Sequence, residues 1–156
     1  MMSLKNNIEK LLQSQNANFE LIEHDTVIHS AKDGAKHFGI DIGQTAATLI
    51  VSADDRLYAV IVSGKSGKLN FDTLGELLSA KCVTMASRER IWDELGMTVG
   101  AVAMVNLPIP CIIDETLLQY DYVYGGTGDK HLTLKLSPKS LLALHENRMV
   151  CKISDM

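Results

Sequence analysis

Apolar residues recur at intervals of three and four in several short segments, which is the spacing of one face of a helix. Four of these segments begin at a serine, whose hydroxyl can accept a hydrogen bond from a free N–H group of the first turn. Two end at a glycine, the residue that most readily adopts the left-handed conformation of a helix C-terminus. The predicted helices are 3–15, 30–39, 72–78, 87–96 and a long one that begins at Ser137-Pro138.

Short apolar runs between these helices predict strands, because they are bounded by turn-forming residues. The predicted strands are 19–22, 46–51, 57–62, 82–85, 112–113, 120–124, 132–136 and 150–153. The pair Asp54-Asp55 lies between the second and third runs and predicts a hairpin. Short strands mixed with short helices favour an α+β (mixed α/β) fold, in which a curved mixed sheet carries helices on its outside.

Composition and charge fit a single domain that spans residues 1–156. Hydrophobic residues make up 46% of the chain and charged residues 22%, as in ordinary globular proteins. The net charge of −4 argues against a protein that wraps long nucleic acid, because such proteins are usually basic. From Arg56 to Arg90, however, six basic residues face three acidic ones. This segment permits contact with a small anionic group such as an RNA end; a solvated surface of mixed charge is the alternative.

The cysteines and the hydropathy predict a cytoplasmic protein without a membrane segment. Cys82, Cys111 and Cys151 are an odd number of distant residues, which favours free thiols in a reducing compartment. The first ten residues lack the apolar core of a signal peptide, and no apolar run approaches the roughly 20 residues of a transmembrane helix. Nothing in the sequence indicates an oligomeric state.

The histidines and the loop 64–68 are the polar features that could bind a ligand. The five histidines show no metal-ligand spacing, so we expect neither a metal nor a cofactor. The loop 64–68 has only two residues between its glycines, and Leu69 follows its second lysine, so it predicts a basic surface loop rather than a phosphate-binding loop. His24 and His29 flank a loop between a strand and a helix, where they either line a pocket or are satisfied imidazoles.

The segment of most chemical interest is the glycine-rich stretch Gly125-Gly126-Thr127-Gly128 between two predicted strands. Glycines let a backbone approach a ligand and leave N–H groups free to point at it, so this stretch predicts a turn that binds a carbonyl or phosphate oxygen. Asp114 ends a strand, where it either caps the following turn or holds a pocket loop in place. Met104 follows Gly100 in an apolar segment, where it either lines an apolar pocket or fills core space.

The order of these features resembles the YbaK-like family, also called the prolyl-tRNA synthetase-associated editing domain, over about residues 4–145. The residues that carry the resemblance are His24, Ala35, the strand 47–51, the segments 82–96 and 100–104, and the blocks 114–118, 126–128 and 134–138. The resemblance implies a barrel-like mixed sheet with outer helices. It also implies a trans-editing hydrolase that deacylates mischarged tRNA, such as alanyl- or cysteinyl-tRNA for proline.

The resemblance further implies a mechanism without a metal. The aminoacyl ester and terminal adenosine would lie in a cleft, where amides of the glycine turn stabilise negative charge on the carbonyl oxygen and a ribose hydroxyl assists. The implied partners are the tRNA acceptor end and, as a further candidate, an aminoacyl-tRNA synthetase. The implied catalytic residues are Gly126, Thr127 and Gly128, and the implied substrate-binding residues are His24, Ser30, Thr48, Gly100, Met104 and Asp114.

The chain departs from the family pattern at two positions. Ala47 stands where the family usually has a lysine, and Met104 stands where it tends to have a proline. A missing cation would weaken binding of an anionic RNA end by about 1–3 kcal/mol. Two alternatives to the deacylase therefore remain: a member that binds an aminoacyl-adenosine, a tRNA end or a protein without turnover, and a hydrolase of another small ester. The lysines that could replace the missing cation are Lys32, Lys36 and Lys65.

Overall fold

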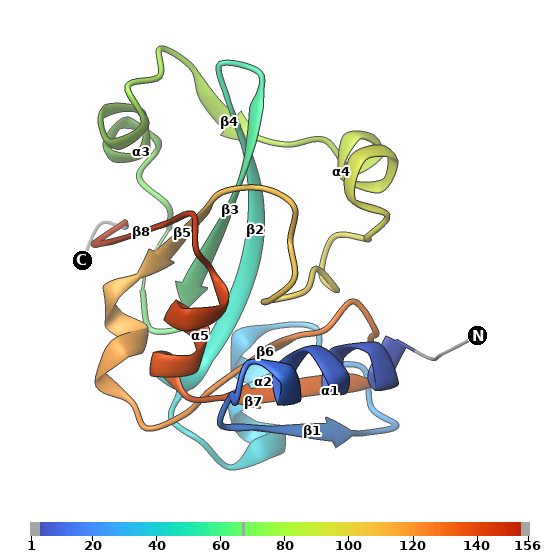
Figure 1. Cartoon of the computed structure of the whole chain (residues 1–156). Helices are drawn as coiled ribbons and strands as arrows, with labels where there is room; N and C mark the ends of the chain where they lie inside the picture. The colour runs from blue at the N-terminus through green and yellow to red at the C-terminus, as the bar shows by residue number, and fades with distance from the viewer. Residues whose placement is uncertain (1–3, 67, 154–156) are drawn as a thin grey trace.

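The computed structural model describes residues 4–66 and 68–153, which form one mixed sheet with helices around it (Figure 1). The helices are α1 (Leu4–Ser14), α2 (Ala31–Phe38), α3 (Phe71–Leu78), α4 (Arg88–Leu95) and α5 (Pro138–Leu144), with 3-10 turns η1 (Ile42–Gln44) and η2 (Glu115–Gln119). The strands are β1 (Phe19–Glu23), β2 (Thr45–Ala53), β3 (Arg56–Ser63), β4 (Val83–Met85), β5 (Cys111–Asp114), β6 (Val123–Gly126), β7 (Leu132–Leu136) and β8 (Arg148–Cys151). None of the described helices has the length and hydropathy needed to span a bilayer.

The strands pair in the order β1-β7-β6-β2-β3-β5-β8, and β4 pairs with β2 beside this path. The pairs β2–β6, β3–β5 and β5–β8 are parallel, and the other pairs are antiparallel. The prediction of a mixed α/β fold with outer helices is therefore confirmed. The described strands do not close into a barrel, because β1 and β8 lie at opposite ends of the order.

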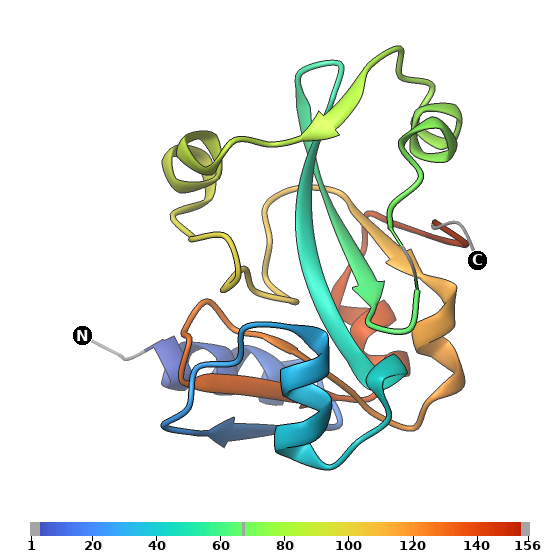
Figure 2. The ribbon, with the colours of Figure 1, turned by 180° about the vertical axis from the view of Figure 1, so that it is seen from behind.

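Alternate residues of β2 and β3 face two separate cores. Ile50 and Ile61 belong to the main core, whereas Val51 and Val60 belong to a second core on the other face of the sheet. The helical residues buried in the main core are Ile8 and Leu12 of α1, Ile91 of α4 and Leu141 of α5. The second core receives Leu74 of α3. Seen from behind, α2 lies across β6 and β7 on the face opposite α1 (Figure 2).

Three predicted N-caps and two predicted C-caps are confirmed, whereas α3 begins at Phe71 with Asn70 as its N-cap, slightly before the predicted start at residue 72. The hydroxyls of Ser30, Ser87 and Ser137 each accept a hydrogen bond from the N–H group three residues later. Gly39 and Gly96 end their helices in the left-handed conformation. The predicted cap Ser3 lies outside the described residues. The last helix is short rather than long, with seven residues.

One predicted strand begins later than expected. The run 120–124 was predicted as a strand, but β6 begins only at Val123. The carboxylate of Asp114 caps the turn η2, which extends to Gln119, and Tyr120 closes that turn through its N–H group. The cap therefore overrides the strand preference of the tyrosines.

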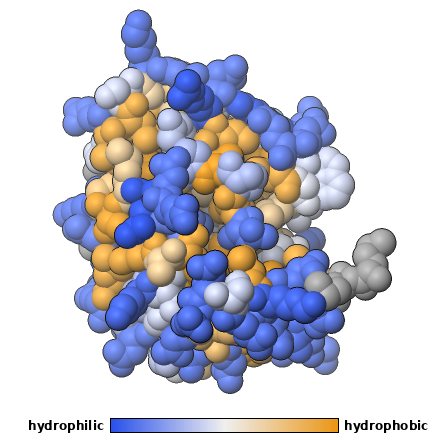
Figure 3. All heavy atoms as spheres, viewed as in Figure 1, coloured by the Kyte–Doolittle hydropathy of each residue, from blue (hydrophilic) through white to orange (hydrophobic). Residues whose placement is uncertain are grey.

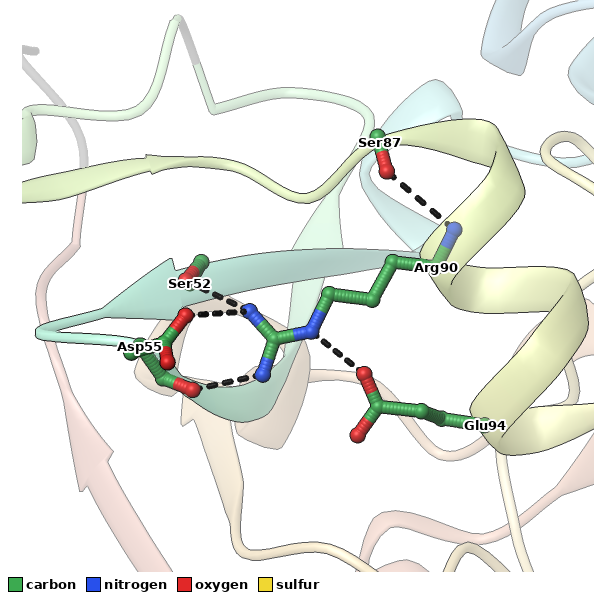
Figure 4. Close-up of polar contacts among 5 residues, drawn as sticks. All are labelled: Ser52, Asp55, Ser87, Arg90 and Glu94. Atoms are coloured by element: carbon green, nitrogen blue, oxygen red, sulfur yellow. Dashed lines mark hydrogen bonds and ion pairs between the residues drawn. The ribbon is translucent and has the colours of Figure 1, made fainter.

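Arg90 of α4 holds the tip of the β2–β3 hairpin (Figure 4). Its guanidinium donates to the Ser52 hydroxyl at 3.0 Å, to the main-chain oxygen of Asp55 at 2.5 Å and to the Glu94 carboxylate. Asp54 and Asp55 have φ angles of 47° and 74°, as in the predicted two-residue hairpin turn. One planar side chain therefore fixes α4 against this projecting turn.

Candidate functional site

The candidate site lies where two parallel strands separate. β2 and β6 pair only at Thr45–Tyr124 and Ala46–Gly125. Beyond this point the main chain of Met104 takes the place of β2 at the edge of β6, because its N–H group donates to the Gly126 oxygen at 2.9 Å. Ala47 and Thr48, which follow in β2, therefore do not pair with Gly126 or with the turn that follows it.

Gly125 and Gly126 lie in strand β6, not in the turn where the sequence placed them. A Cβ atom on Gly125 would lie 2.5 Å from the sulfur of Met104, and one on Gly126 would collide with the Val102 oxygen. These glycines therefore serve close packing against the segment 102–104. Of the glycine-rich stretch, Gly128 has a positive φ, of 101°.

The Thr127 side chain closes the turn between β6 and β7. It is 1% exposed, and its hydroxyl donates to the Leu132 oxygen at 2.9 Å and accepts from the Asp129 N–H at 3.1 Å. The Thr127 side chain is therefore engaged within the turn, and a catalytic role predicted for this residue would involve its main-chain N–H group. The residues that the structure describes offer no acceptor to the N–H groups of Thr127 and Gly128. Two successive free N–H groups form a concavity suited to a negatively charged oxygen.

The neighbouring segment 101–104 also carries unpaired groups. Val102 and Ala103 are 5% and 3% exposed, yet their N–H groups have no acceptor among the described residues. Buried N–H groups are rarely left unpaired, so these two mark a place for water or a ligand. No sequence signal identifies them, because any residue except proline supplies an N–H group. Gly100, which precedes this segment, is exposed with a φ of 91°.

Thr48 and Ala47 point to opposite faces of β2. Thr48 shares the face of Ala46 and Ile50 in the main core, and its Oγ1 is the one buried side-chain polar atom among the described residues without a hydrogen-bond partner. Ala47 is exposed on the other face, the face to which the buried Thr45 also points. The sequence grouped Thr48 with the position of the family lysine, but strand alternation separates the two side chains.

His24 lies on the face of the sheet that α2 covers. Its Nδ1 donates to the Thr26 oxygen at 2.7 Å, and its Nε2 lies 2.8 Å from the Thr133 hydroxyl. Thr133 pairs directly with Gly126 across the β6–β7 ladder. His24 also borders a hollow of about 360 Å³ together with Asp129 and His131. His24 is therefore hydrogen-bonded to the residue that pairs with Gly126, directly before the turn.

Ser30 is the N-cap of α2, where its hydroxyl accepts a hydrogen bond from the Asp33 N–H at 3.1 Å. The first turn of this helix lies against the loop after β3, since a Cβ atom on Gly64 would lie 2.7 Å from the Cβ of Ala31. Lys65 follows in that loop and is exposed. Lys32 and Lys65, two of the lysines predicted to replace the missing family lysine, therefore follow directly on Ala31 and Gly64, the residues at which α2 meets this loop.

Asp114 caps the turn that follows it, which was one of its two predicted alternatives, and it also holds the loop after β3. It is 1% exposed. One carboxylate oxygen accepts from the Thr116 N–H at 3.0 Å and so caps η2. The other accepts from the Ser63 N–H at 3.0 Å and the Ser66 hydroxyl at 2.5 Å, and so holds the loop that carries Lys65. The hydroxyls of Ser63 and Ser66 gave no signal in the sequence.

Met104 is fully buried, which favours its predicted alternative as a core residue. Burial also raises the pKa of the Cys111 thiol to about 12, so this cysteine is protonated and unsuited to act as a nucleophile. The described residues contain no group of three or more His, Cys, Asp or Glu side chains that could hold a metal ion.

The chain belongs to the aminoacyl-tRNA editing domain family, whose model matches residues 25–144. A proline–tRNA ligase of Thermosipho melanesiensis is 26% identical over 105 residues, which is 66% of this chain and 18% of the ligase. The chain therefore spans about a fifth of that relative. These matches confirm the resemblance to the prolyl-tRNA synthetase-associated editing domain.

Solved structures with the same fold include a protein proposed as a trans-editing enzyme for prolyl-tRNA synthetase. It is 24% identical, with a TM-score of 0.86, and the match covers 100% of this chain and 99% of that one. The hypothetical protein APE2540 is 26% identical, also with a TM-score of 0.86, over 95% of this chain and 99% of its own. These structures share the fold over almost their full length.

Proposed function

We propose that this protein is an aminoacyl-tRNA deacylase that hydrolyses the ester of mischarged tRNA, with alanyl- and cysteinyl-tRNA for proline as its substrates. The observation that carries the proposal is the set of unpaired N–H groups around Gly126, in a chain of the editing-domain family. Four such groups flank Gly126: those of Val102 and Ala103 lie in the segment on the Met104 side of β6, and those of Thr127 and Gly128 lie in the turn that follows β6.

In the proposed reaction the carbonyl oxygen of the ester accepts from the N–H groups of Thr127 and Gly128. Negative charge that develops on this oxygen as water attacks strengthens these hydrogen bonds, so the transition state is bound more tightly than the ester. The Thr48 hydroxyl, unpaired in the free protein, donates to the substrate. The junction of α2 with the loop at Lys65 provides positive charge for the RNA end, since the N-terminus of a helix carries partial positive charge.

The proposal is tested by deacylation of a panel of mischarged tRNAs, beginning with Ala- and Cys-tRNA for proline. The variant Thr48→Val removes the unpaired hydroxyl while conserving shape, and we expect hydrolysis to fall at least several-fold. Thr45→Val is the matched control on the same strand, because the Thr45 hydroxyl donates to the Ile42 oxygen at 2.7 Å instead. Folded wild-type protein that hydrolyses no member of the panel would overturn the proposal.

The alternative is a member of the family that binds an aminoacyl-adenosine, a tRNA end or a protein without turnover. The exposed Ala47 favours it, because the family lysine is missing there. Ala47→Lys distinguishes the two, with Ala47→Met as an uncharged control of similar length. Hydrolysis that appears only in the lysine variant would favour the binding protein, whereas hydrolysis by the wild type excludes it.

A further inference from the structure

The imidazole of His145 is connected to the glycine turn through the main chain of Met104. His145 follows α5 and is 6% exposed. Its Nε2 lies 2.7 Å from the Met104 oxygen. Because a carbonyl oxygen only accepts, Nε2 carries the hydrogen. The Met104 N–H group in turn donates to the Gly126 oxygen at 2.9 Å.

The second of these hydrogen bonds fixes the direction of a free N–H group. The Gly126 oxygen and the Thr127 N–H group belong to one planar trans peptide, so they point in opposite directions. Met104 holds the oxygen on the side where β2 separates from β6, and the Thr127 N–H group is therefore directed to the opposite side, toward β7. A carbonyl that accepts a hydrogen bond also polarises the N–H group of its own peptide, which makes Thr127 a better donor.

We propose that His145 is a positioning residue for the glycine turn: it holds Met104, and through it the 126–127 peptide, in the orientation that presents the Thr127 N–H group. This inference rests on the proposed deacylase function. His145 does not touch the substrate in this arrangement. Met104 packs tightly, with its sulfur against Gly125, so a shift of its main chain is transmitted to β6.

His145 is buried, but it borders a hollow at the surface. This hollow of about 340 Å³ is lined by residues of α1, α5 and the segment 106–110. Helices α1 and α5 lie on the face shown in Figures 1 and 3. Apolar and hydrophilic residues meet on this face (Figure 3). Burial lowers the pKa of His145, against the opposing effect of its bond to Met104, so the ring is neutral at neutral pH.

The test compares three substitutions of His145 with one control. Gln places its amide nitrogen near the original Nε2 and retains a donor, whereas Leu has no donor and Asn is too short to reach Met104. We expect kcat to fall about tenfold in the Leu and Asn variants with KM nearly unchanged, and to be largely restored in the Gln variant. Leu141→Ala in α5 removes a buried side chain of the main core, and we expect it to lower stability without changing kcat of the folded protein.

A second measurement separates failure of this inference from failure of the proposed function. The NMR chemical shift of the Thr127 amide and the hydrogen exchange of the Met104 amide report the connection without any substrate. We expect both to change in the Asn variant and to stay near wild type in the Gln variant. Unchanged amides in the folded Asn and Leu variants would overturn the inference, as would a kcat of Leu141→Ala that falls as far as that of His145→Leu. A wild type without hydrolysis overturns the function alone.

Discussion

The Asp114 carboxylate accepts a hydrogen bond from the Ser66 hydroxyl at 2.5 Å, which joins the end of β5 to the loop after β3. The same oxygen accepts from the Ser63 N–H, so both ends of a short loop are held by one buried carboxylate. Lys65 lies between these two serines. The Asp114 side chain thus fixes the loop that carries Lys65.

Replacing Asp114 with alanine removes three hydrogen bonds from a buried position. We expect the free energy of unfolding to fall by about 2–4 kcal/mol, because the N–H groups of Ser63 and Thr116 lose their acceptor. Urea denaturation measures this loss. Ser66→Ala, which removes only one donor, should cost less than half as much, and an equal loss in both variants would contradict this account.

Two threonines of β2 should respond in opposite ways to the change to valine. The Thr48 hydroxyl is buried without a partner, so Thr48→Val should leave the free energy of unfolding unchanged or raise it. The Thr45 hydroxyl donates to the Ile42 oxygen, and Thr45→Val should lower the free energy of unfolding by about 1 kcal/mol. Denaturation midpoints compare them. A larger loss at Thr48 than at Thr45 would show that the Thr48 hydroxyl is paired in solution.

Replacing Arg90 should lower the free energy of unfolding more than replacing Arg88, which is exposed on the same helix. Arg90→Ala removes the hydrogen bonds to Ser52 and Asp55, and we expect a loss of about 1–2 kcal/mol together with faster hydrogen exchange in α4. Arg88→Ala is the control, because Arg88 is exposed and forms no ion pair with the described residues. Its effect should stay within about 0.5 kcal/mol. Equal effects would contradict the role of the guanidinium.

His145 should make stability depend on pH in the acidic range. Its pKa is lowered mainly by burial and also by the charge of Arg148, while Glu146 lines the same hollow. Between its lowered pKa and the ordinary value of 6.5, the unfolded chain binds the proton and the folded protein does not. Stability from the neutral ring is therefore full above about pH 6.5 and is lost as pH falls toward the lowered pKa.

The measurement is the free energy of unfolding from pH 8 to pH 5 for the wild type and His145→Gln. The Gln variant keeps the donor to Met104 but does not titrate, so its curve should fall less steeply below pH 6.5. The other histidines contribute equally to both proteins and cancel in the difference. Parallel curves would show that His145 is not buried as a neutral ring.

The sequence by itself determined the local structure, because the signals for it lie within a few residues. Ser30 and Ser87 begin helices, Gly39 and Gly96 end them, and Asp54-Asp55 makes the hairpin turn, each through contacts within its own segment. The mixed fold and the family also follow from the order of these elements.

Only the tertiary structure decided how the candidate residues are grouped. Strand alternation put Ala47 and Thr48 on opposite faces, and the packing of Met104 explains why Gly125 and Gly126 belong to a strand. The unpaired N–H groups and the connection from His145 to Gly126 join segments far apart in the chain. No pattern of side chains predicts them, because main-chain hydrogen bonds depend on which backbones lie side by side and not on the residues that they carry.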